Sequence, residues 1–465
     1  MGFKIYGMKK IKAAILLSAI LLTSCKSASS TQKNASTVSK NITDVQLMDR
    51  VQRDALKYFW DFAEPNSLMG RERYHEDFYP KNDANVVTTG GSGFGLMTIL
   101  VGIERGFIPR KEAVKRLSHI ADFLAKADRH HGAWPHWLNG ETGKTVNFGN
   151  KDSGGDIVET AFLTQGLMVV REYFKNGNAE EKALAEKMDK LWKGVEWNWY
   201  TKGGEKVLYW HWSPIDGWLM NHKIQGYDET LITYILAASS PTYPIDAETY
   251  YQGFTRNGGY LTSNTKYGLP LIVKHNGAEE YGGPMFWEHY SYLALDPNGL
   301  SDRYIKNYFD LTRNHALIQY RYSVENPKKF KGYGENYWGL TASYTRNPDG
   351  SVGYRAHNPK EDNGVIAPTA AISSMPYTPK ESLNVLRFLY TQKPQFIGSA
   401  GPYDATSVHF DNWFTPRYLA IDQGTIAPMI ENYRTGLLWK LFMNAPEIKA
   451  GLKKLDFKST KYNLK

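Results

Sequence analysis

The sequence predicts an all-α fold, a toroid of helices of the (α/α)6-barrel type with short β pieces in its rim loops. Three observations lead to this prediction. Apolar residues recur at helical spacing along most of the chain, whereas strict alternation over several residues is scarce. No linker divides the chain after residue 45. Loops rich in glycine, aromatic and acidic residues precede several helices, and such loops at one end of many helices are expected to surround a cleft.

The predicted elements follow from this periodicity. The helices are expected at residues 44–64, 91–106, 112–128, 156–175, 179–200, 228–239, 301–323, 379–391 and 423–444. Short β pieces are expected near residues 205–212, 269–275 and 351–356. The glycines at 90–95 do not match a dinucleotide fingerprint, because Leu96 stands where the third glycine is required. Close packing of a neighbouring helix explains them better.

Composition points to a large globular domain that is unusually aromatic. The apolar fraction is 42% and the charged fraction 22%, which is ordinary for a globular protein. Phe, Trp and Tyr make up 14% of the chain. Many of these rings can serve the core, but Trp and Tyr also offer a flat apolar face with a polar group. Sugar rings present flat C–H faces, so the aromatic excess favours a carbohydrate-binding domain over residues 45–465.

The N-terminus has the pattern of a lipoprotein signal. A basic start, Met8 to Lys12, precedes an apolar stretch that is too short to span a membrane, and Leu22-Thr23-Ser24-Cys25 follows. We therefore expect a signal peptide at 1–24, a lipidated Cys25 and a flexible tether over 25–44. The protein would be exported and held in the cell envelope by the lipid anchor alone, on the periplasmic face or the outer membrane surface. The alternative is a buried cysteine in a signal-like helix.

Charge and cysteine content exclude several classes of function. The net charge is +9, and loss of the four lysines before Cys25 leaves +5, which is too weak to indicate a nucleic-acid partner. Cys25 is the single cysteine, so the mature domain has no disulfide, zinc–cysteine site or cysteine nucleophile. Because no close His/carboxylate spacing occurs, no metal site is predicted, and no cofactor. The expected state is a monomer.

The most informative stretch is an acidic cluster at a helix start. Asp156 and Glu159 are three residues apart and would share a helix face, with Asp152 about one turn upstream. Asp156 as N-cap and Glu159 at the third helical position could also form a capping box. For Glu159 alone this structural role is favoured. One helix start does not need three acids, however, so the cluster as a whole indicates function.

A second acid is expected from another helix. Glycoside hydrolysis requires two carboxyl groups that flank the scissile bond, and two acids on one helical turn cannot easily do so. Within Tyr227-Asp228-Glu229-Thr230, Asp228 is suited to cap the helix, which would leave Glu229 at the first helical position, facing the rim. The alternative is that Glu229 only complements the helix dipole.

Further side chains are candidates for substrate contacts. Each could instead pack in the rim with its hydrogen bonds satisfied, and Asp422 is also suited to cap the helix that follows it. These substrate-binding candidates are Trp134, His136, Trp212, Glu288, Tyr290, Trp338 and Asp422.

Over residues 45–445 the chain resembles glycoside hydrolase family 144, the glucoamylase-like bacterial domain that includes endo-β-1,2-glucanases. The resemblance rests on Lys-Asp-Ser-Gly-Gly-Asp-Ile-Val-Glu-Thr at 151–160, Gln-Gly-Tyr-Asp-Glu-Thr at 225–230 and Ile-Asp-Gln-Gly at 421–424. It implies an (α/α)6 barrel, a substrate of β-1,2-linked glucose and inversion at the anomeric carbon. It also places the acidic cluster and Glu229 in the cleft.

These observations lead to one main hypothesis and two rivals. The main hypothesis is an inverting β-1,2-glucan hydrolase in which Glu229 is the general acid and Asp156 the general base or the group that positions water. Asp152 and Glu159 would support them. The first rival is another activity on the same barrel, either exo-acting release of sophorose or α-glucan hydrolysis. The second is a non-catalytic glycan-binding lipoprotein.

Overall fold

The computed structural model describes residues 38–39, 41–78 and 83–464. The described residues belong to one compact unit. The predicted signal peptide, Cys25 and most of the predicted tether lie outside the described residues. Within the described part of the chain, no helix is both long enough and apolar enough to cross a membrane.

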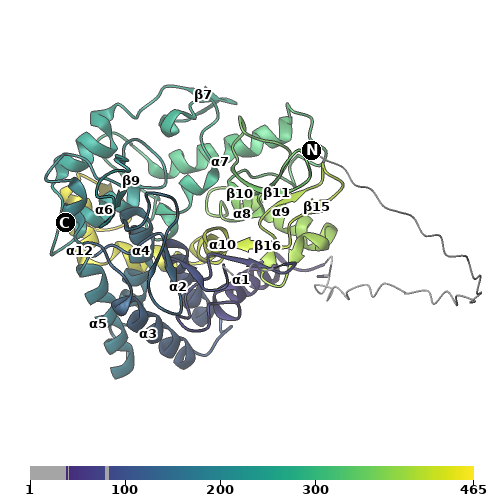
Figure 1. Ribbon diagram of the computed structural model, residues 1–465. Helices are drawn as coiled ribbons and strands as arrows, with labels where there is room; N and C mark the ends of the chain where they lie inside the picture. The colour runs from purple at the N-terminus through teal and green to yellow at the C-terminus, as the bar shows by residue number, and fades with distance from the viewer. Residues whose placement is uncertain (1–37, 40, 79–82, 465) are drawn as a thin grey trace, which may run out of the picture. The chain divides into compact units, whose positions relative to one another are not determined.

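Helices dominate the unit, with short strands between them (Figure 1). The helices are α1 (Asp44–Trp60), α2 (Thr89–Glu104), α3 (Arg110–Lys126), α4 (Ile157–Phe174), α5 (Ala179–Lys193), α6 (Leu231–Ser239), α7 (Tyr308–Glu325), α8 (Pro368–Ile372), α9 (Pro379–Gln392), α10 (Ala420–Arg434), α11 (Leu437–Met443) and α12 (Pro446–Lys454). Every helix predicted from the sequence is present, although several boundaries differ. The predicted helix 423–444 is two helices, because Gly436 adopts a left-handed conformation between α10 and α11. Neither α8 nor α12 was predicted.

The chain alternates between helices of two kinds. In α1, α3, α5 and α9 only one face is buried, and charged residues cover the other. In contrast, α2, α4, α6, α8 and α10 are buried on almost every side. A helix that is apolar all round must be enclosed by other elements. The buried helices pack on one another, α2 on α4 and α10, α4 on α6, and α8 on α10, while α3 packs on α5.

The strands are short and pair antiparallel in small sheets, many of which join distant segments. They are β1 (Arg73–His75), β2 (Val86–Thr88), β3 (Trp137–Asn139), β4 (Thr145–Val146), β5 (Gly155–Asp156), β6 (His211–Trp212), β7 (Thr265–Lys266), β8 (Leu269–Pro270), β9 (Leu300–Ser301), β10 (Ala342–Arg346), β11 (Val352–Ala356), β12 (Ile397–Gly398), β13 (Gly401–Pro402), β14 (Thr406–Ser407), β15 (Trp413–Phe414), β16 (Arg417–Leu419) and β17 (Lys458–Ser459). The pairs β1–β16, β2–β3 and β5–β6 each precede a buried helix, so they fix the segments that lead into α10, α2 and α4.

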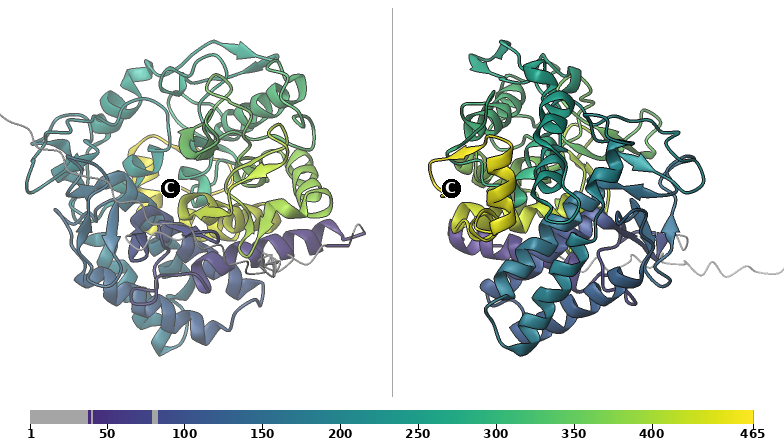
Figure 2. Two further views of the ribbon diagram at one scale, coloured as in Figure 1. Left: turned by 45° about the vertical axis from the view of Figure 1, so that its right-hand side comes forward. Right: turned by 90° about the vertical axis from the view of Figure 1, so that its left-hand side faces the viewer.

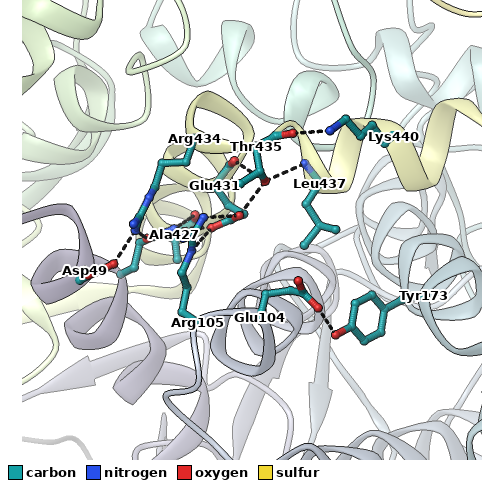
Figure 3. Close-up of polar contacts among 11 residues, drawn as sticks. Asp49, Glu104, Arg105, Tyr173, Ala427, Glu431, Arg434, Thr435, Leu437 and Lys440 are labelled. Carbon is teal, nitrogen blue, oxygen red and sulfur yellow. Dashed lines mark hydrogen bonds and ion pairs between the residues drawn. The ribbon is translucent and has the colours of Figure 1, made fainter. Parts of the chain in front are cut away.

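Partly buried ion pairs join the early helices to α10 (Figure 3). Arg105, which follows α2, donates two hydrogen bonds to Glu431 of α10, at 2.6 and 2.7 Å. Arg434 of α10 donates to Asp49 of α1 at 2.6 Å. These bonds hold α1 and α2 against α10, although α10 lies more than 300 residues later in the sequence. At the other side, α12 packs on α6, which places the C-terminal segment beside the middle of the chain (Figure 2).

The glycines of α2 allow it to approach α4 closely, as the sequence indicated. A Cβ atom on Gly93 would lie 2.3 Å from the carbonyl oxygen of Phe162 and 2.5 Å from the Cα atom of Leu163. On the facing helix, a Cβ atom on Gly166 would lie 2.3 Å from the carbonyl oxygen of Gly93. These contacts are with backbone atoms, which cannot move aside as a flexible side chain can.

Gly93→Ala is therefore expected to force α2 away from α4 and to lower the free energy of unfolding by about 1–3 kcal/mol. Chemical denaturation with circular dichroism detection measures the change. Gly149→Ala is the matched control, because a Cβ atom there meets no atom within 4 Å. Equal stability of the two variants would contradict the close packing of α2 on α4.

Candidate active site

Two adjacent cavities open where the buried helices begin. The first has a volume of about 380 Å³ and is lined by Thr88 before α2, Glu159 in the first turn of α4, Glu229 before α6 and Leu419 before α10. The second, of about 610 Å³, has Asp152 and His211 in its wall. Both cavities share His136, Phe148 and Trp210. Asp152, Glu159 and Glu229, from distant parts of the sequence, therefore line two adjoining cavities that share wall residues.

Asp156 anchors the acidic cluster from beneath the cavity floor. Its Oδ1 caps α4 by accepting hydrogen bonds from the backbone N–H groups of Val158 at 3.0 Å and Glu159 at 2.9 Å. Its Oδ2 lies 3.0 Å from His136 Nδ1 and 3.4 Å from His211 Nε2. Asp156 is fully buried and lines neither cavity. Both oxygens are occupied, so Asp156 orients the groups above it and presents no free lone pair to a substrate.

The register of β5 and β6 supplies a histidine that the sequence analysis did not identify. Asp156 pairs with His211 across these strands, and Gly155 pairs with Trp212. His211 Nε2 lies 3.2 Å from Asp152 as well. The sequence analysis chose the neighbouring Trp212 as a candidate, whereas His211 makes the contact with the acids. Two carboxylates and two imidazoles thus form one buried network.

Glu159 is not part of a capping box. Its Oε2 accepts a hydrogen bond from the backbone N–H of Gly90 at 2.8 Å, whereas the Asp156 N–H donates to the carbonyl of Trp134. The capping-box interpretation is therefore wrong for Glu159, although Asp156 does cap α4. Burial, opposed by His136 and reinforced by Asp156, raises the pKa of Glu159 to about 7. This carboxyl group lines the first cavity and can exchange a proton near neutral pH.

The histidines of the network are held in their charged form. Burial alone would lower the pKa of His136, but Glu159 and Asp156 raise it to about 9. Burial opposes the charge on His211 too, and Asp152 and Asp156 raise its pKa to about 9. Although burial favours the neutral acid, hydrogen bonds from both histidines hold the pKa of Asp156 well below its ordinary value. Asp156 is thus ionised and both histidines are protonated at neutral pH.

This network predicts a loss of stability at alkaline pH. The folded-state pKa of His211 lies above the ordinary value of 6.5, so its contribution is complete below pH 6.5 and disappears as pH rises through about 9. The free energy of unfolding is expected to fall across this range, on the order of 2 kcal/mol for His211. Urea titrations at pH 6 and 9.5 measure it. His211→Asn should reduce this fall, whereas His119→Asn, at an exposed position, should not. An equal fall in all three proteins would refute the assignment.

Glu229 lies two residues before the start of α6 and not within its first turn. Asp228 accepts hydrogen bonds from the backbone N–H and the hydroxyl of Thr230, and α6 begins only at Leu231. The prediction that Asp228 caps the helix and that Glu229 is its first residue is therefore wrong by a few residues. Ser291 fixes the segment by donating a 2.6 Å hydrogen bond to the carbonyl of Glu229. The Glu229 side chain nevertheless lines the first cavity.

The surroundings of Glu229 favour its neutral form. Burial, followed by the nearby carboxyl groups of Asp228, Glu159 and Asp156, raises the pKa of Glu229 well above its ordinary value. Burial also raises the pKa of Asp228, to about 6. A carboxyl group that stays protonated at neutral pH can donate a proton to a leaving group.

The remaining candidates from the sequence divide between cavity and core. His136 and Tyr290 line the first cavity. Trp134, Trp338 and Glu288 are fully buried and outside both cavities, so the prediction that they contact substrate is at odds with their positions. The indole N–H of Trp134 donates to the carbonyl of Leu124, and that of Trp338 points to the carbonyl of Glu381.

Trp212 and Asp422 also lie outside the cavity walls. Trp212 is half-buried and packs edge-on against His131 and Trp199. Asp422 is buried beside Asp404, and burial together with this second carboxyl raises the pKa of Asp422 well above its ordinary value. Asp422 lies within α10 and is not its cap, which is Leu419.

Other residues of the cavity wall were not identified from the sequence. Glu72 and Arg73 come from β1 and the residue before it, and Tyr344 and Tyr354 come from the β10–β11 hairpin. These strands reach the cavity only through their pairing, as when β1 pairs with β16. No local motif marked them. The only available signal was for Tyr354, since a β piece was predicted at 351–356.

Comparison with known proteins gives this site a context. Residues 221–446 match the Glycoamylase family model, described as "Putative glucoamylase". The chain is 55% identical to an endo-β-1,2-glucanase from Chitinophaga pinensis, crystallised with sophorotriose and glucose, covering 90% of this chain and 99% of that one with a TM-score of 0.86.

A curated relative is the exo β-1,2-glucooligosaccharide sophorohydrolase (non-reducing end) of Parabacteroides distasonis, 44% identical over 437 residues. The match covers 89% of this chain but spans only 58% of that relative's length. An endo-β-1,2-glucanase from Talaromyces funiculosus, 11% identical with a TM-score of 0.62 over 89% of this chain and 88% of that one, shares the fold. The identity with the Chitinophaga pinensis protein over nearly its whole length shows that the chain belongs to glycoside hydrolase family 144, the family that its motifs resemble.

Proposed function

We propose that this protein hydrolyses β-1,2-glucan. The observation that carries the proposal is that Glu159 and Glu229, from separate helix starts, line one cavity. The pKa of Glu159 is raised to about 7, and that of Glu229 is raised well above its ordinary value. The similarity to two proteins named for cleavage of β-1,2-linked glucans indicates the substrate. Histidine and aromatic side chains in the cavity wall provide hydrogen bonds and flat faces for sugar rings.

In the proposed mechanism Glu229 is the general acid. It donates its proton to the glycosidic oxygen as the bond from that oxygen to the anomeric carbon breaks. Glu159 accepts a proton from the water that attacks the opposite face of the sugar, so the anomeric configuration inverts. The sequence-based choice of Asp156 as the base fits its burial poorly. Asp156 is better described as a positioning residue that orients His136 and the start of α4, with Asp152 supporting His211.

Helices with one buried face alternate along the chain with helices that are buried on almost every side. This alternation supports an (α/α)6 barrel as the architecture of the fold. In such a barrel, buried helices form an inner ring and one-sided helices an outer ring. The contacts of α10 with both α1 and α2 would close this ring. The cavity would then lie at the end of the barrel where the inner helices begin.

Endo-acting cleavage is the favoured mode, because the chain covers nearly the whole Chitinophaga pinensis endo-glucanase but only part of the exo-acting relative. Incubation with linear β-1,2-glucan, followed by sizing of early products, tests both points. A spread of oligosaccharides is expected, whereas release of sophorose alone would favour exo action. Hydrolysis of starch instead would favour an α-glucan hydrolase, and binding without any turnover a glycan-binding protein.

We further propose that Cys25 carries a lipid that anchors the protein in the cell envelope. The proposal rests on the basic and apolar segments that precede Cys25. Metabolic labelling with palmitate is expected to mark the wild-type protein in the membrane fraction. Cys25→Ser should lose the label, and a labelled Cys25→Ser protein would contradict the proposal.

A further inference from the structure

We propose that His275, Glu288 and His315 form a zinc site behind the Glu229 segment. The three residues come from different parts of the chain: His275 lies in the turn η5 (His275–Gly277), Glu288 ends the turn η6 (Met285–Glu288), and His315 belongs to α7. All three are fully buried. One donor atom from each lies within 4.8 Å of the others. The inference goes beyond the proposed hydrolysis and does not depend on it.

Two measured distances between donor atoms lie on either side of the separation between ligands in a tetrahedral zinc site. The Oε1 atom of Glu288 lies 2.9 Å from His315 Nδ1 and 3.9 Å from His275 Nδ1. Ligands about 2.0–2.1 Å from a tetrahedral zinc ion lie about 3.3–3.4 Å from one another. Small side-chain shifts are therefore sufficient to place a metal among the three donors. Two imidazoles and one carboxylate suit zinc, whereas calcium and magnesium favour oxygen ligands alone.

His275 is the observation that points to a ligand. Neither of its ring nitrogens has a hydrogen-bond partner among the described residues, and its side chain is fully buried. A buried polar group without a partner is unfavourable, because it has lost its hydrogen bonds to water and gained none in the protein. An ion pair between His315 and Glu288 would satisfy those two residues and leave His275 unexplained. A metal bound at His275 Nδ1 would give that nitrogen a partner and would bring all three side chains into one site.

His315 is held as a metal-binding histidine usually is. Its Nε2 lies 3.0 Å from the carbonyl oxygen of Gly283, while its Nδ1 faces Glu288. A histidine ligand commonly donates its second ring N–H to a backbone carbonyl, which fixes the tautomer and the ring orientation. The backbone can approach this closely because residue 282 is glycine. A Cβ atom on Gly282 would lie 2.3 Å from His315 Nε2, and its φ of +85° favours glycine.

The site is connected to Glu229 on two sides. Tyr227 donates a 2.7 Å hydrogen bond to Glu288 Oε2. Asn276, the residue after His275, donates a 2.6 Å hydrogen bond to Asp228. Tyr227, which precedes Glu229 by two residues, is thus bound to the proposed ligand Glu288. Asp228, which directly precedes Glu229, is bound to the neighbour of the proposed ligand His275. The metal would brace this segment without contacting substrate, so its role is structural.

The test is the zinc content of the full mature chain, purified, exposed to zinc chloride and dialysed against metal-free buffer. Mass spectrometry is expected to find about one zinc per chain in the wild type and less than about a fifth of that in His275→Gln and Glu288→Gln. His357→Gln is the matched control, because His357 is equally buried with unpartnered nitrogens within the described chain but belongs to no such cluster. It should retain the zinc.

A second measurement remains informative if the variants fold poorly. Removal of metal from the wild type with dipicolinate should lower the melting temperature, and zinc chloride should restore it. A wild type that binds no zinc would overturn the proposal, as would zinc retained by His275→Gln. Loss of zinc from His136→Gln alone would also overturn it, because His136, Asp152 and Asp156 form the other possible group of donors in the described chain.

Discussion

Glu229→Gln is expected to lower kcat on β-1,2-glucan by on the order of 10³-fold, with little change in KM or in thermal stability. The amide has nearly the same shape as the acid but cannot donate the proton that the leaving oxygen requires. Burial and the neighbouring carboxyl groups raise the pKa of Glu229 well above its ordinary value, which favours the protonated form that an acid needs. Initial rates of reducing-end formation, with circular dichroism of both proteins, measure the two effects.

An activated substrate separates loss of the acid from general damage to the site. A dinitrophenyl leaving group departs without protonation, so the variant should hydrolyse a dinitrophenyl β-sophoroside at a rate much closer to that of the wild type. Glu335→Gln, an exposed carboxyl group outside both cavities, is the control and should behave as wild type on both substrates. Near-normal activity of Glu229→Gln on β-1,2-glucan would remove Glu229 from the mechanism.

Helices could be predicted from the sequence because their apolar content and periodicity are local properties. The stretch that forms α2 is apolar on every side, and α4 begins at a strong cap, Asp156. A predicted helix boundary was wrong where a polar side chain forms a hydrogen bond with a nearby backbone N–H group. The side chain of Asp228 binds Thr230 instead of capping a helix at its own position, which delays the start of α6.

The two acids proposed for catalysis were predictable because they stand at helix starts. Glu159 and Glu229 met that condition, and the resemblance to a family pointed to the same positions. Residue type alone does not show whether a side chain lines a cavity or packs in the core. Trp134 and Trp338 are as suited to stacking on sugars as Trp210 is, yet only Trp210 lines a cavity. That difference depends on contacts between segments that are distant in the sequence, which residue type does not encode.

Glu159→Gln is expected to lower kcat/KM on β-1,2-glucan by about 10²–10⁴-fold, because an amide cannot accept a proton from the attacking water. The glutamine can still accept the hydrogen bond from the Gly90 N–H, so the start of α4 should remain intact. The pKa of Glu159 is about 7, so the wild-type activity should rise as pH increases through 7 and Glu159 loses its proton. A pH profile of kcat/KM should show this rise in the wild type and not in the variant.

Azide distinguishes a missing base from a displaced substrate. In Glu159→Ala, azide can attack the anomeric carbon without giving up a proton, while Glu229 still protonates the leaving oxygen. Addition of azide should therefore restore turnover and yield the α-glycosyl azide, since a single displacement inverts a β-glycoside. Glu141→Gln, at an exposed position, should show neither the loss nor the rescue. A β-glycosyl azide would indicate two successive displacements through a different nucleophile that the variant still contains. It would replace inversion by retention, with Glu159 as the acid–base residue instead of the base of an inverting enzyme.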